Sequence, residues 1–186
     1  MKLNDLRSVD FMSWLPRDDR GTSTVNRLII VASGYESRAS YWARQVLNHL
    51  KPSEANTWCV VGFTDRKRHL SRPSNDLFYE ERNLDVTEFP SQDSELILAY
   101  IKELVRELLG RAKDEPVEIH LDYSSMPRAW YCWLFTELES TIRAKDRLYF
   151  WYCAGIYDDS EYPTAGVSDF KVFSGAANMA GGRVVA

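Results

Sequence analysis

Short apolar segments alternate with longer amphipathic segments along most of this chain of 186 residues, and this alternation restricts its fold more than any other feature. Buried strands are predicted at 27–33, 57–63, 117–123 and 147–153, with a further strand within 78–89. Helices are predicted at 36–51, 94–109 and 127–143, the first two ended by Pro52 and Gly110. Strands separated by helices of this length are typical of β-α-β units. We therefore predict an α/β fold, a three-layer Rossmann-like domain with a mostly parallel sheet, over residues 27–153.

The two ends of the chain depart from this pattern. Residues 1–26 are a polar lead segment, and residues 154–186 are a loop-rich tail containing many Gly, Asp and Ser. The tail either packs back onto the sheet or leads to a missing C-terminal part. A chain of this length fits one domain with such extensions.

Composition excludes several classes of protein. Hydrophobic residues make up 45% of the chain and aromatic residues 13%, which is enough to build a core. A net charge of -4 argues against general nucleic-acid binding, while it permits a local basic pocket for a small phosphorylated ligand. No apolar run is long enough to cross a bilayer, and the first 16 residues lack the apolar core of a secretion signal. Cys59, Cys132 and Cys153 lie in apolar segments and are predicted to be buried free thiols, so we expect a cytoplasmic protein without membrane contact.

Segment 117–123 alternates apolar and polar residues, whereas an inner strand of a parallel sheet is usually apolar on both faces. Its polar face carries Glu118, His120 and Asp122. This face either lines a polar cavity or an interface, or it is the wet face of an edge strand.

Three loops that follow predicted strands carry much of the polar chemistry, at 33–38, 64–69 and 122–128. In an open α/β sheet, ligands bind outside the carboxyl ends of the strands, which lie at one edge. We therefore expect these loops to belong to one site, with the turns at Gly34 and Ser124 facing each other across a common cleft.

The loop after the first strand supplies the candidate ligand-binding residues Ser33, Gly34, Tyr35, Glu36 and Arg38. Gly34 would let a ligand approach the backbone, and Arg38 would hold a phosphate with its fork of N–H donors. The alternative is that Glu36 and Arg38 cap the helix and pair with other side chains. A single glycine does not make the G-x-G-x-x-G dinucleotide fingerprint, so an NAD-dehydrogenase site is not expected.

The loop after the strand at 117–123 supplies the candidates Asp122, Ser124, Ser125, Met126 and Arg128. A strand-to-helix turn with hydroxyls and an arginine suits an anion, because the first N–H groups of the helix are unpaired and its dipole favours negative charge. Ser125 is predicted to be the helix N-cap, with Pro127 in the first turn, and plain capping is the alternative to a binding role. Asp122 would contact a ribose hydroxyl or orient Arg128.

Other polar and aromatic features have plainer interpretations. Residues 66–68 with Arg72 are more typical of a solvated loop than of a binding site. Trp130 and Trp133 are predicted to pack in the core, with base stacking as the alternative. His69 and His120 lack Cys or His partners at metal-ligand spacing, so no metal site is expected.

The candidate loops resemble those of CRISPR-associated Rossmann fold (CARF) domains, which bind cyclic oligoadenylates as ligand sensors in antiviral defence. The resemblance covers roughly residues 27–153. The later loop of that family follows a strand ending in Asp and reads Thr-Gly-Gly-Thr-Lys. Here Asp122 matches the strand end, Ser124 the first hydroxyl and Arg128 the basic position, while Ser125-Met126-Pro127 replaces Gly-Gly-Thr. The resemblance implies a sensor or regulatory domain for a nucleotide second messenger, which we expect to act as a homodimer.

A second resemblance is to TIR domains. Residues 29–38 resemble their first strand and loop, and Ser125, Trp133 and Glu137 reproduce the spacing of a serine, a tryptophan and a glutamate in that family. This resemblance implies a nucleotide-hydrolysing effector with NAD as substrate and Glu137 as catalytic carboxylate; otherwise no cofactor is expected. A third alternative is a protein–protein interaction domain of a defence complex, with an aromatic surface around Trp151 and Tyr152.

Overall fold

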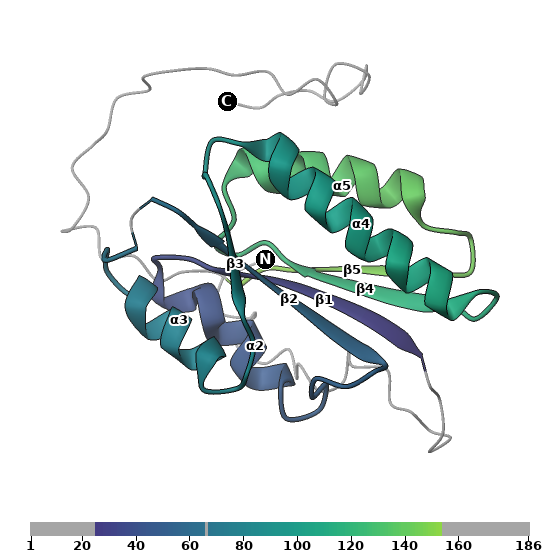
Figure 1. The fold of residues 1–186 in the computed structure, drawn as a ribbon, viewed down its shortest axis with the longest axis horizontal. Helices are drawn as coiled ribbons and strands as arrows, with labels where there is room; N and C mark the ends of the chain where they lie inside the picture. Colours follow the sequence, from purple (N-terminus) through teal and green to yellow (C-terminus); the bar gives the residue numbers. More distant parts are fainter. Residues whose placement is uncertain (1–24, 66, 154–186) are drawn as a thin grey trace, which may run out of the picture.

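The core of the protein is a five-stranded sheet in which every neighbouring pair of strands is parallel. The computed structural model describes residues 25–65 and 67–153, so the predicted lead segment and tail lie almost wholly outside the described residues. The strands are β1 (Asn26–Ser33), β2 (Asn56–Phe63), β3 (Val86–Phe89), β4 (Val117–Asp122) and β5 (Arg147–Trp151). Their order across the sheet is β3-β2-β1-β4-β5 (Figure 1). The predicted α/β Rossmann-like fold is confirmed.

Helices cover both faces of this sheet (Figure 1). The 3-10 helix η2 (Ser37–Ser40), α2 (Tyr41–Val46) and α3 (Arg72–Glu80) lie on one face, and α4 (Ser94–Ala112) and α5 (Arg128–Thr141) lie on the other. Successive side chains of a strand point to opposite faces. Leu28 and Ile30 of β1 accordingly pack with α4 and α5, while Ile29 and Val31 pack with α2 and α3. Burial on both faces explains the continuous apolar run of β1.

Several predicted boundaries are wrong in detail. The first helix was expected over 36–51, but its regular part ends at Val46, followed by turns that still bury Leu47 and Leu50. Arg72 was expected in a solvated loop with residues 66–68, but it begins α3, which has a proline in its first turn, where the missing N–H costs nothing. α4 continues through Gly110, the predicted stop, and ends beside Lys113, which has a φ of 50°.

β4 lies between β1 and β5, so the edge-strand alternative for this segment is wrong. All six residues of the strand are buried. Glu118 accepts a hydrogen bond from Arg27 Nε at 2.8 Å, and His120 Nδ1 accepts one from Trp151 Nε1 at 3.1 Å. His120 also stacks against Tyr149, with ring centroids 4.7 Å apart. The polar face of β4 is therefore packed against partner side chains rather than facing solvent.

The tryptophans and cysteines differ from one another in burial. Trp130 is fully buried as predicted, but Trp133 is 38% exposed, so its predicted core position is wrong. Cys59 and Cys153 are buried free thiols, whereas Cys132 is half-buried.

Within the described ranges, no helix combines the length and the apolar character needed to span a membrane.

Candidate functional site

The strand order creates a switch point between β1 and β4. The chain leaves β1 toward the face covered by α2 and leaves β4 toward the face covered by α5 (Figure 1). At such a point the two loops diverge and leave a crevice at the carboxyl edge of the sheet, where open α/β sheets bind ligands. The loops after β1 and β4 contact each other here: a Cβ added to Gly34 would lie 2.0 Å from Ser125 Oγ. Gly34 thus allows Ser125 to approach the first loop.

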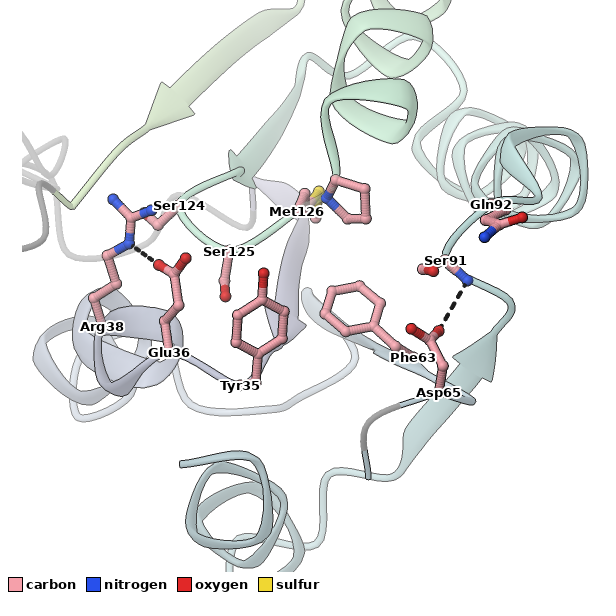
Figure 2. Close-up of a pocket in the computed structure, with 11 residues that line it drawn as sticks. Tyr35, Glu36, Arg38, Phe63, Asp65, Ser91, Gln92, Ser124, Ser125 and Met126 are labelled. Carbon is pink, nitrogen blue, oxygen red and sulfur yellow. Dashed lines mark hydrogen bonds and ion pairs between the residues drawn. The ribbon is translucent and has the colours of Figure 1, made fainter. Parts of the chain in front are cut away.

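An open pocket of about 320 Å³ occupies this edge. It is lined by residues from the loops after four strands (Figure 2): Tyr35, Glu36, Arg38, Phe63, Asp65, Ser91, Gln92, Ser124, Ser125, Met126 and Pro127. The volume lies at the lower end of the range for small-molecule sites, which is about 300–1,000 Å³.

Chemically different side chains line the two ends and the middle of this pocket. Arg38, Glu36 and Ser124 lie at one end in Figure 2. The rings of Tyr35 and Phe63 lie in the middle, with centroids 6.5 Å apart. Asp65, Ser91 and Gln92 lie at the other end, where Asp65 Oδ1 accepts a hydrogen bond from Ser91 N at 3.3 Å. The site therefore offers a cation with a hydroxyl, then aromatic surface, then acceptor and amide groups.

The first loop is held in place by α3. Asn75 is buried, and its Nδ2 donates to the carbonyl oxygens of Gly34 and Glu36, both at 2.9 Å. Ser40 Oγ donates to Asn75 Oδ1 at 2.8 Å, which fixes the orientation of the amide. Sequence reasoning missed this positioning residue because it predicted no helix at the position of α3.

Asp122 and Ser124 form a buried polar pair below the pocket. Asp122 Oδ1 accepts hydrogen bonds from the backbone N and the Oγ of Ser124, the former at 3.0 Å. Ser124 Oγ in turn accepts from Cys153 N at 2.7 Å. Burial of the Asp122 carboxyl raises its pKa to about 6, against the opposing effect of the hydrogen bonds from Ser124. Asp122 Oδ2 is buried and has no hydrogen-bond partner in the described part of the chain.

The structure brings most, but not all, of the predicted site residues together. Those that line the pocket are Tyr35, Glu36, Arg38, Ser124, Ser125 and Met126. Ser33 is buried away from it and donates to Asp76 Oδ1 at 2.5 Å. Gly34 and Asp122 support the lining residues, and Arg128 is exposed at the start of α5 without lining the pocket.

Two predicted roles are corrected. Ser125 was expected to cap α5, but the N-cap is Pro127 and no side chain bonds there; Ser125 lies instead against Gly34. Arg72 was expected in a solvated loop, but it is 1% exposed and donates to the carbonyl oxygen of Phe63 at 2.9 Å. Of the basic run beside it, Lys67 and Arg68 are exposed, and Arg66 lies outside the described residues.

Sequence reasoning missed two residues at the far end of the pocket, Ser91 and Gln92, whereas Asp65 lies in the predicted loop at 64–69. Ser91 and Gln92 follow β3, a strand of 4 residues whose limits the sequence left open, so the loop after it was not considered. Phe63 and Asp65 close β2 and begin its loop. The signal for all of them is the same carboxyl-edge rule that selected the other loops.

Glu137, the carboxylate of the TIR-type interpretation, lies on α5 and is not among the residues that line the pocket. Its Oε1 is 2.6 Å from Lys102 Nζ on α4. The described ranges contain no cluster of three or more His, Cys, Asp or Glu side chains able to hold a metal ion.

Comparison with known proteins adds no family to these observations. No protein-family model matches the chain, and neither a curated protein nor a solved structure matches it.

Proposed function

We propose that this protein is a sensor or regulatory domain that binds a nucleotide-type ligand at the carboxyl edge of its sheet. The observation that supports this most is the pocket at the β1/β4 switch point. This pocket combines a cation, aromatic surface and polar acceptors. Nucleotides present the complementary set of groups: phosphate, a flat base, and ribose or amino donors.

The lining suggests how such a ligand would lie. A phosphate would be held at the end with Arg38, since a guanidinium forms charge-assisted hydrogen bonds with phosphate oxygens. The base would pack on the half-buried ring of Tyr35, which lies beside the buried ring of Phe63. Hydroxyl or amino groups of the ligand would donate to Asp65 at the far end.

The size of the pocket limits what one chain would take. About 320 Å³ suits a mononucleotide unit rather than a whole cyclic oligonucleotide. A cyclic oligoadenylate would therefore place one unit in the pocket of each of several chains. For this reason we also propose that the protein acts as a homodimer. The role in prokaryotic antiviral defence rests on the resemblance of the loops to CARF domains.

Calorimetric titration and thermal-shift measurements would test this with AMP, cyclic dinucleotides and cyclic oligoadenylates. A ligand at a hundred times its Kd adds about 2.7 kcal/mol to the stability of the folded state. Arg38→Ala is expected to weaken binding at least about tenfold, because a hydrogen bond to a charged group is lost. Arg128→Ala is the matched control, since Arg128 does not line the pocket, and it is expected to bind like the wild type.

Two results would contradict the proposal. One is the absence of binding by every nucleotide in the panel. The other is binding that Arg128→Ala abolishes while Arg38→Ala leaves it intact, which would place the ligand outside this pocket.

A further inference from the structure

Two side chains that line the pocket also hold the segment that follows β5. Arg38 Nη1 donates to the carbonyl oxygen of Cys153 at 3.0 Å and to Tyr152 Oη at 2.8 Å. Ser124 Oγ accepts from the backbone N of Cys153 at 2.7 Å. Both backbone polar groups of Cys153 are therefore bonded to side chains of the pocket.

The orientation of both side chains is fixed from inside the site. Arg38 Nε donates to the carboxylate of Glu36, which also lines the pocket. The hydroxyl of Ser124 donates its proton to Asp122, which leaves a lone pair to accept from Cys153 N. Arg38 also lies over the ring of Tyr152, with Cζ 5.2 Å from the centroid. A change at Arg38 or Ser124 therefore changes the contacts of residues 152–153.

We infer that the pocket and the segment after β5 form one switch, in which a ligand phosphate that takes the hydrogen bonds of Arg38 releases Tyr152 and Cys153. This inference rests on the proposed function, and it names the segment that responds to occupancy of the pocket. Tyr152 and Cys153 are the last two residues of the described range 67–153.

Binding and release are linked reciprocally in such a switch. If the ligand competes with Tyr152 for Arg38, then removing the Tyr152 hydroxyl must strengthen ligand binding by the same coupling. Tyr152→Phe keeps the ring over Arg38 and removes the acceptor at 2.8 Å. We expect this variant to bind the ligand about five- to tenfold more tightly than the wild type.

Hydrogen exchange at the Cys153 amide measures the release directly, because that amide is bonded to Ser124 Oγ. Arg38→Ala is expected to speed exchange about tenfold. Glu36→Ala is expected to speed it as well, because Arg38 then loses the carboxylate that orients its side chain. Arg106→Ala is the control: Arg106 is exposed on α4 and pairs with Glu103, so exchange at Cys153 should stay as in the wild type.

The same exchange measurement is then made with AMP as the probe ligand, and the binding of AMP is followed separately by calorimetry. AMP that binds and speeds exchange at Cys153 supports the switch, and AMP that binds without changing exchange overturns it. If AMP does not bind, the proposed function fails for this probe, and the Glu36→Ala result then decides. Wild-type exchange in Glu36→Ala would show that the pocket and the segment are not coupled, and faster exchange would show that they are.

Discussion

At the scale of single residues, the contact between the loops after β1 and β4 requires a residue without a Cβ atom at position 34. Gly34 lies where the loops after β1 and β4 contact each other, and any Cβ at that position would overlap Ser125 Oγ and come within 2.8 Å of its Cβ. Asn75 holds the same loop through the carbonyl oxygen of Gly34. The first loop is therefore fixed from both sides.

We predict that Gly34→Ala destabilises the protein by about 1–3 kcal/mol, the usual cost of overpacking a close contact. Ser125→Gly removes both overlapping atoms, so the double variant should recover most of that loss. Urea unfolding of the wild type, the two single variants and the double variant measures the interaction energy as a cycle. Strictly additive effects would show that the two residues do not contact each other as described.

At the scale of elements, the sequence predicted the strands better than the helices. β1 and β2 are buried on both faces, so their apolar runs are unmistakable. α3 was missed because its sequence is charged and contains a proline, and because its buried residues include Arg72 and Asn75 but no aliphatic side chain. Only the folded structure supplies the carbonyl and carboxylate partners that make an arginine suitable for a buried position.

The buried Arg72 joins α3 to β2 and β3. It bonds to the carbonyl oxygen of Phe63, to Asp76 at 2.7 Å and to Glu88 at 3.2 Å. We predict that Arg72→Met lowers the free energy of unfolding by about 3 kcal/mol, because its partners lose their cation. Arg106→Met is the control: Arg106 is exposed and pairs with Glu103, so its loss should cost less than about 0.5 kcal/mol in the same urea experiment. Equal effects of the two substitutions would contradict this role for Arg72.

At the scale of the whole molecule, the sequence predicted the sheet edge at which the pocket lies but not all of the residues that line it. Parallel strands end at one edge, and this rule placed the loops after β1 and β4 in one site before the strand order was known. The rule does not give the order of strands, which the structure shows to be β3-β2-β1-β4-β5. Ser91 and Gln92 were not predicted because they follow β3, a short strand whose limits could not be fixed from the sequence.

Global stability should depend on pH through Asp122. Its pKa is raised from 3.8 to about 6 by burial, so between these values the folded state binds more protons than the unfolded state. Stability from this group is therefore greatest at low pH and falls as pH rises through 6. From pH 5 to pH 7 we predict a loss of about 1–2 kcal/mol relative to Asp122→Asn, which keeps an oxygen to accept from Ser124. Parallel pH profiles for the wild type and this variant, measured by urea unfolding, would contradict the prediction.

The aromatic packing between α2 and β5 has a practical consequence. Trp42 and Trp151 stack with their ring centroids 5.3 Å apart, and His120 lies beside both. Two indoles this close share their electronic excitation, which produces a paired circular-dichroism band that isolated tryptophans lack. Denaturation separates the rings and removes that band, so unfolding can be followed by circular dichroism without an attached dye.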